Sequence, residues 1–133
     1  MSEEMDQNLA KWKKGLENGR REIPRAYRND HTVRRTLQCA LYQMLQEPGL
    51  RVVADYMPPR IADRAVDLIA VNENGEILYA ICIDTLVTLA AVKSLGSFAA
   101  ENKLIVTTGL LEKTVQESKF FLNPEIKHIH LQL

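Results

Sequence analysis

The hydrophobic periodicity of the chain changes at Pro48-Gly49, and this change restricts the folds that the sequence can adopt. Before this dipeptide, apolar residues recur with the spacing of amphipathic helices. After it, short apolar runs alternate with turn signals, which predicts strands. Two further helical patterns lie between the later strands. The predicted order is therefore α, α, β, β, β, α, β, α, β.

The first helix is predicted from one apolar stripe on an otherwise polar segment. Ser2 or Asp6 is suited to cap this helix, and Asn18-Gly19 is expected to end it. Because only one face is apolar, the helix must pack on its own domain or on a second copy of the chain. The stripe consists of Met5, Leu9, Trp12 and Leu16.

A polar linker and a second helix are expected next. Residues 20–30 are polar and are broken by Pro24, so they are predicted to be the linker. Asp30 is a good N-cap for the second helix, which should stop at Pro48-Gly49. The apolar positions that repeat with a helical period are Val33, Leu37, Ala40, Leu41, Met44 and Leu45.

The remaining elements predict an α/β fold with a central mixed sheet of about five strands, flanked by helices and preceded by an extra N-terminal helix. The first three strands can form an antiparallel meander, whereas the helix after the third lets the fourth join in parallel. The predicted strands are 51–56, 64–71, 76–84, 103–107 and 126–133, and the later helices are 88–99 and 111–121.

The composition fits one small globular domain. The chain has 133 residues, of which 46% are hydrophobic, and 26% are charged. We divide it into an N-terminal helix and linker, residues 1–28, and an α/β domain, residues 29–133. No apolar run approaches the roughly 20 residues that span a bilayer. The acidic and then basic start lacks the apolar core of a secretion signal, so a cytoplasmic protein without membrane partners is expected.

The cysteines and histidines give no strong metal signal. Cys39 and Cys82 lie in apolar segments and are predicted to be buried free thiols. A disulfide is not expected in a reducing compartment, and neither His128 nor His130 is suitably spaced from a thiol for a zinc site. These histidines share one face of the last strand, where they are predicted to be exposed edge residues.

Two aspartates stand in otherwise apolar strands. Asp67 lies within residues 64–71, and Asp84 ends the nearly continuous apolar run that precedes it. Burial of an unpaired carboxylate costs several kcal/mol, so each aspartate needs a partner or a role. Asp67 could pair with Arg64 or Arg51 at a strand end. Asp84 could cap the helix that follows.

The element order and the acid on the second strand resemble those of the PD-(D/E)XK nuclease superfamily, the restriction-endonuclease-like fold, over about residues 31–122. In that family, the third strand of the meander reads apolar, Glu, apolar, Lys, Ser/Thr. The resemblance implies that Asp67 matches the first acid. It also implies that two carboxylates hold a divalent metal ion and that the lysine orients or activates the attacking water.

The third strand of this chain departs from the family pattern in either register. One alignment puts Cys82 at the glutamate position and Asp84 at the lysine position. A shift by two makes Asp84 the second acid, and Leu86 then replaces the lysine. A thiol is a poor ligand for Mg²⁺, which prefers hard oxygen ligands. The resemblance therefore implies a catalytically degenerate nuclease-like protein that needs no cofactor.

An active enzyme is the alternative. It would be a Mg²⁺-dependent endonuclease with Asp67 and Asp84 as metal ligands and catalytic residues. Lys93, in the following helix, would then supply the cation that the third strand lacks.

Positive charge is concentrated in the N-terminal part of a chain whose net charge is zero. Residues 10–35 hold nine lysines and arginines against three acids, which suits either duplex DNA or a solvated helix face. The first helix also allows an assembly module without a nucleic-acid role, in which the apolar stripe packs across a two-fold axis of a homodimer. The residues expected to bind nucleic acid are Lys11, Lys13, Lys14, Arg20, Arg21, Arg34 and Arg35.

Overall fold

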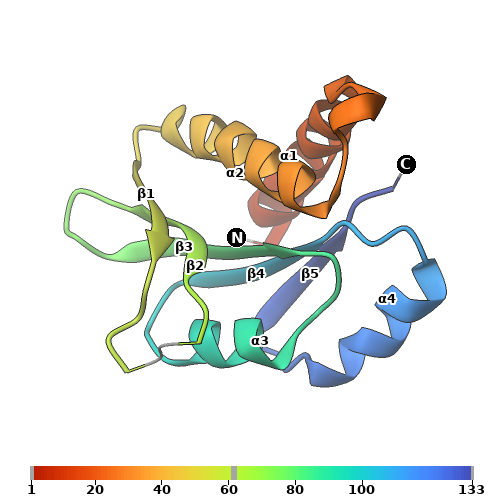
Figure 1. Ribbon diagram of the computed structural model, residues 1–133. Coiled ribbons are helices and arrows are strands. Elements are labelled where there is room, and N and C mark those ends of the chain that lie inside the picture. Colours follow the sequence, from red (N-terminus) through yellow and green to blue (C-terminus); the bar gives the residue numbers. More distant parts are fainter. Residues whose placement is uncertain (1, 61–62, 133) are drawn as a thin grey trace.

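The computed structural model describes residues 2–60 and 63–132 and has a five-stranded sheet with helices on both faces (Figure 1). The predicted α/β class with an extra N-terminal helix is confirmed. The strands are β1 (Arg51–Tyr56), β2 (Val66–Val71), β3 (Ile77–Asp84), β4 (Asn102–Thr107) and β5 (Ile126–His130). The helices are α1 (Ser2–Glu22), α2 (Asp30–Gln46), α3 (Leu89–Gly96) and α4 (Glu112–Ser118), with the 3-10 helices η1 (Arg25–Tyr27) and η2 (Lys119–Phe121).

The strands lie in chain order across the sheet, and the predicted meander is confirmed. β1 pairs with β2 and β2 pairs with β3 in antiparallel fashion, whereas β4 joins β3 and β5 joins β4 in parallel. The segments containing α3 and α4 make the two crossovers that parallel pairing requires. As a result, the carboxyl ends of β3, β4 and β5 open onto one edge of the sheet, where ligands commonly bind in α/β folds.

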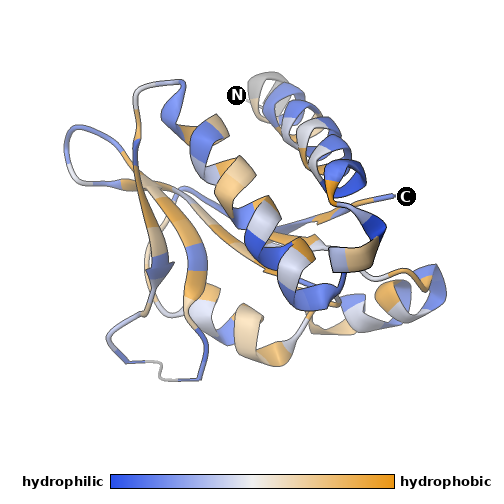
Figure 2. Ribbon diagram, turned by 45° about the horizontal axis from the view of Figure 1, so that its top comes forward, coloured by the Kyte–Doolittle hydropathy of each residue, from blue (hydrophilic) through white to orange (hydrophobic). Residues whose placement is uncertain are grey.

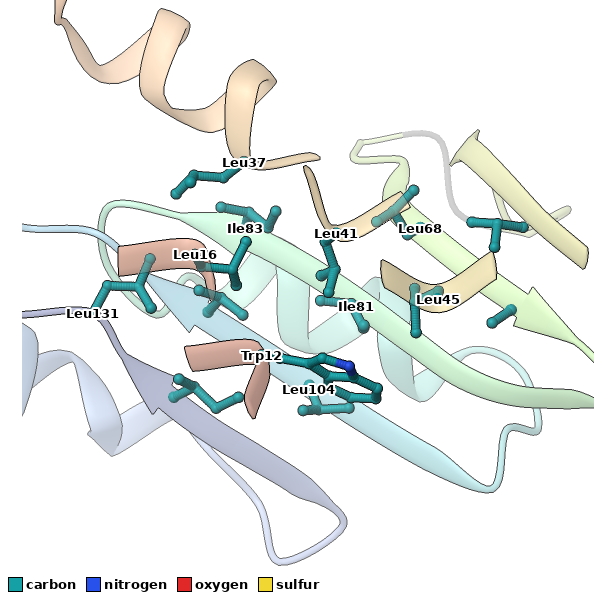
Figure 3. Close-up of a cluster of buried hydrophobic side chains, with 14 of the residues drawn as sticks. Trp12, Leu16, Leu37, Leu41, Leu45, Leu68, Ile81, Ile83, Leu104 and Leu131 are labelled. Carbon is teal, nitrogen blue, oxygen red and sulfur yellow. The ribbon is translucent and has the colours of Figure 1, made fainter. Parts of the chain in front are cut away.

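Helices cover the two faces of the sheet unequally. α1 and α2 lie over one face, and the shorter α3 lies over the other (Figure 1). The outward sides of α1 and α2 are polar (Figure 2). The larger core cluster lies between α1, α2 and the sheet (Figure 3), and a smaller cluster packs under α3. The largest fully buried side chains of the larger cluster are Leu16, Leu37, Leu41, Leu45, Leu68, Ile81, Ile83, Leu104 and Leu131.

The apolar stripe of α1 packs against the chain's own core. Met5, Trp12 and Leu16 are buried there, and Leu9 is partly buried against the same cluster. The Trp12 ring meets Tyr79 of β3 edge-on, with the ring centroids 5.0 Å apart. Burial of one large apolar side chain stabilises a fold by about 1.5–3 kcal/mol. This packing therefore anchors α1 in the fold and leaves the stripe without a free face for a second copy.

The start of the chain shows two corrections to the predicted boundaries. α1 does not end at Asn18-Gly19 but runs to Glu22, just before Pro24. A single glycine costs a helix only about 1 kcal/mol, and tertiary packing outweighs that cost here. The N-cap of α2 is Asn29 and not Asp30, because Asn29 forms a reciprocal capping box with Thr32.

Other boundaries also differ from the sequence prediction. Residues 20–30 are not only a linker, since they include the last turn of α1 and the η1 helix. β2 begins two residues later than predicted, α3 is shorter at both ends, and β5 stops at His130. None of the helices among residues 2–60 and 63–132 is both long and apolar enough to span a bilayer.

The two cysteines differ in burial. Cys82 is buried as predicted, but Cys39 is exposed, which corrects the prediction for that residue. Leu37 and Leu41 of α2 point into the core, so a residue midway between them falls on the outer face of the helix. Both thiols are free.

Candidate functional site

The candidate site lies where β2 and β3 separate. The last residue pair between β2 and β3 is Leu68 with Ile81, so Asp67, the neighbouring residue of β2, has no paired residue in β3. The Asp67 carboxylate enters this gap and accepts a hydrogen bond of 2.6 Å from the Ile83 amide. Asp67 is fully buried, so its charge depends entirely on protein partners.

Two arginines supply the opposite charge from different parts of the chain. Arg34 of α2 donates from Nη2 to Asp67 Oδ1 at 2.7 Å. Arg64, just before β2, donates from Nη2 to Asp67 Oδ2 at 2.9 Å. Gln38, one turn after Arg34, donates to the Asp67 carbonyl at 2.9 Å. The aspartate thus links α2 to the ends of both strands.

Arg64 also binds the second aspartate. Its Nε lies 3.1 Å from Asp84 Oδ2, and its Nη2 lies 2.9 Å from Asp84 Oδ1. The hydroxyl of the buried Ser94 in α3 donates to the Arg64 carbonyl at 2.6 Å and fixes the backbone of this residue. The Arg64 guanidinium therefore lies between the carboxylates of Asp67 and Asp84.

Electrostatics in this cluster favour the charged form of the arginine. Burial would lower the pKa of Arg64, but Cys82 and the two aspartates raise it, so the net pKa lies above its ordinary value. Burial also raises the pKa of the Cys82 thiol to about 12, and the aspartates add to this effect. At neutral pH, Cys82 is therefore a neutral thiol that behaves as a small apolar side chain.

The cluster is electrically balanced without a metal ion. Two carboxylates face two guanidinium groups, and each carboxylate oxygen is engaged by an arginine or a backbone amide. Mg²⁺ needs several oxygen ligands at about 2.0–2.1 Å. No group of three or more His, Cys, Asp or Glu side chains in residues 2–60 and 63–132 could hold a metal ion.

The sequence-derived catalytic residues are only partly brought together. Asp67 and Asp84 each form an ion pair with Arg64. Lys93 is exposed on α3, and in the described part of the chain it forms no ion pair with either aspartate. The Arg64 partner considered for Asp67 is present. Asp84 does not cap α3, because the N-cap is Thr88, whose hydroxyl accepts from the Ala91 amide.

Three residues of the cluster were missing from the sequence-based site or had another role in it. The sequence predicts Arg34 as a nucleic-acid contact and gives Gln38 and Ser94 no role. Arg34 and Gln38 are four residues apart, and Gln38 is only 5% exposed between two core leucines. A polar pair at this spacing on the inner side of a helix indicates a buried acceptor opposite it.

The predicted basic residues have different environments. Arg34 binds Asp67, Arg35 binds Asp55, and Arg20 is buried at 5% exposure. The remaining members lie on α1: Lys11, Lys14 and Arg21 are exposed, and Lys13 is half-buried.

The histidine pair lies on the edge strand as expected, but its side chains are half-buried. Both rings approach the hydroxyl of Thr107 in β4, with His128 Nε2 at 2.8 Å and His130 Nδ1 at 2.9 Å. A threonine hydroxyl has one proton, so one ring accepts it and the other ring donates. The pair therefore fastens β5 to β4.

A cavity of about 220 Å³ lies next to the site at the carboxyl edge of the sheet. Arg34 and Asp84 form part of its wall, together with the first turn of α2. Its lining residues are Asp30, His31, Arg34, Asp84, Thr85 and Thr108.

Comparison with known proteins gives one distant structural similarity. No family model matches the chain, and no curated protein matches it. The chain is similar to the crystal structure of a repair endonuclease from Pyrococcus abyssi, with a TM-score of 0.42 and 14% sequence identity. The alignment covers 80% of this chain and 48% of the endonuclease, so this chain spans about half the length of that protein.

Proposed function

We propose that this chain is a PD-(D/E)XK-like domain that binds nucleic acid without cutting it, because Arg64 takes the place of a catalytic metal ion. The observation that carries this proposal is the double contact of Arg64. Its guanidinium lies 2.9 Å from a carboxylate oxygen of Asp67 and 2.9 Å from one of Asp84.

A guanidinium cannot replace the chemistry of a divalent ion. It balances charge, but it neither lowers the pKa of a bound water nor binds both that water and a scissile phosphate as a Lewis acid. Arg64 is only 10% exposed at its side chain, and its backbone carbonyl is held by Ser94. Displacement of a buried ion-pair partner costs about 3–5 kcal/mol, which works against metal entry.

Cleavage of supercoiled plasmid tests the catalytic part of the proposal. Wild-type protein incubated with Mg²⁺ or Mn²⁺ is expected to leave the plasmid intact. The Asp67→Ala variant is the control for a contaminating nuclease, since any such activity would persist in it. Metal-dependent nicking by wild type that disappears in Asp67→Ala would contradict the proposal and support the active endonuclease.

The nucleic-acid part is supported by an exposed basic stripe on α1. Lys11, Lys14 and Arg21 lie at helical spacing, and all three are exposed. Lys11 reaches Glu47 at 3.5 Å, but both side chains are about two-thirds exposed. Such a pair contributes about 0–1 kcal/mol at most, so Lys11 can turn to a phosphate at little cost.

Binding to duplex DNA at two salt concentrations tests the stripe. Wild type is expected to bind with a Kd below about 10 μM at low salt, and to bind more weakly as salt is raised. The triple variant Lys11→Gln, Lys14→Gln, Arg21→Gln should reduce the slope of log K against log salt by about 2.7. The double variant Lys113→Gln, Lys127→Gln removes exposed lysines elsewhere and should leave that slope nearly unchanged. If wild type shows no salt-sensitive binding, the proposal that this chain binds duplex DNA is wrong.

A further inference from the structure

A buried arginine outside the carboxylate cluster lacks partners. Arg20, in the last turn of α1, is 5% exposed. Its Nε and Nη1 atoms are buried and have no hydrogen-bond partner in the described part of the chain. Burial of an unpaired charged donor is costly, and native structures almost always satisfy it with protein, water or an ion.

The surroundings of Arg20 add positive charge to this region. Burial and the nearby Arg28 lower the pKa of Arg20, and Asp30 is the neighbouring acid that opposes them. Within residues 2–60 and 63–132, no ion pair joins Asp30 to Arg20. Arg28 uses Nη2 to donate to the carbonyls of Arg21 and Ile23, and its Nε is also buried without a partner.

This arginine pair lies at the carboxyl edge of the sheet. Glu17, three residues before Arg20 on α1, accepts a hydrogen bond of 2.6 Å from the Gln132 amide just after β5, so the last turn of α1 lies close to the end of β5. His130 lines a cavity of about 340 Å³ together with Glu112 of α4, and Asp30 lines the cavity of about 220 Å³ near Arg34. Gln132, which binds Glu17 of α1, also lines the cavity of about 340 Å³, so the end of α1 lies beside that cavity.

We infer that Arg20 and Arg28 form a phosphate-binding site at the carboxyl ends of β4 and β5. Phosphate carries one to two negative charges and several strong acceptor oxygens, which match two guanidinium groups with unused N–H donors. A monovalent halide would satisfy fewer donors. The inference does not depend on the carboxylate cluster. Only the assignment of the phosphate to a nucleic-acid backbone rests on the proposed function.

Thermal unfolding with inorganic phosphate tests the site. Phosphate at about 20 mM should raise the Tm of wild type by about 5 °C over chloride of equal ionic strength, if its Kd is about 1 mM. Arg20→Met keeps the long apolar stem and removes the unpaired charge. It should melt no lower than wild type in chloride and should lose the phosphate-dependent rise. Lys127→Gln, an exposed change on β5, should retain that rise.

Duplex DNA binding then distinguishes the two sources of phosphate. If the site holds a backbone phosphate, Arg20→Met and added inorganic phosphate should each weaken duplex binding at constant ionic strength. If the site holds a small phosphate compound, duplex affinity should be unchanged while the phosphate-dependent Tm rise remains. The inference is overturned if phosphate gives wild type no specific rise, if Arg20→Met keeps the rise, or if Arg20→Met melts lower in chloride. None of these results depends on the outcome of the plasmid cleavage test.

Discussion

Substitution of Asp67 by asparagine distinguishes a structural carboxylate from a catalytic one. The amide keeps nearly the same shape but removes the negative charge that Arg34 and Arg64 share. A carboxylate kept for metal binding is usually held at a cost in stability, so its removal leaves stability unchanged or increases it. The ion network described above predicts the opposite effect.

The size of the effect follows from the burial of the partners. Loss of one partner of a buried ion pair costs about 3–5 kcal/mol. Arg64, with a side chain 10% exposed, keeps Asp84, and Arg34 is 35% exposed and can turn to water, so the lower end of that range applies. We therefore expect Asp67→Asn to lower the free energy of unfolding by about 3 kcal/mol, a large part of the 5–15 kcal/mol typical of a domain.

Urea unfolding followed by circular dichroism measures this loss. Asp55→Asn is a matched control, because Asp55 also pairs with an arginine of α2 but its side chain is 48% exposed. That change should cost less than about 1 kcal/mol. If Asp67→Asn unfolds at the same or a higher urea concentration than wild type, the carboxylate is not structural and the reasoning fails.

Three further predictions follow from single residues. Burial, followed by Lys119 and His130, lowers the pKa of His128 to about 4, so only the unfolded state takes up this proton between about pH 6.5 and pH 4. The free energy of unfolding should therefore decrease by about 1 kcal/mol as pH is lowered through that window, a modest value because the ring is half-exposed. In urea unfolding at a series of pH values, His128→Gln should remove this pH dependence, and an unchanged dependence would contradict the assignment to His128. Cys39 should react with a thiol reagent in the native protein, whereas Cys82 should react only in denaturant; equal rates would contradict the burial. Gly109→Ala should lower the Tm, because a Cβ there would lie 2.7 Å from the Thr85 carbonyl; an unchanged Tm would mean that the loop yields freely.

Most of the fold was predictable because it depends on local periodicity. The change from helical to strand spacing at Pro48-Gly49 locates the start of the sheet, and the helix after residue 84 sets the change to parallel pairing. Helix ends were less predictable. Asn18-Gly19 is a good stop signal, but packing of Trp12 and Leu16 on the sheet carries α1 past it.

The candidate site was predictable only in part, because its arginines come from distant positions in the chain. Asp67 stands out in an apolar strand, and Arg64 lies three residues before it. The contact with Arg34 joins residues 33 positions apart and depends on how α2 crosses the sheet. The spacing of Arg34 and Gln38 beside the apolar face of α2 indicates a buried acceptor, but the sequence alone does not identify that acceptor as Asp67.

Titration with Mn²⁺ by isothermal calorimetry tests the central claim, that Arg64 occupies the place of the metal ion between Asp67 and Asp84. Wild type is expected to show no site tighter than about 1 mM, whereas Arg64→Gln, which removes the cation between the two carboxylates, should bind at least tenfold more tightly. Binding of one Mn²⁺ per wild-type chain at micromolar concentration, lost in Asp67→Asn, would contradict the claim.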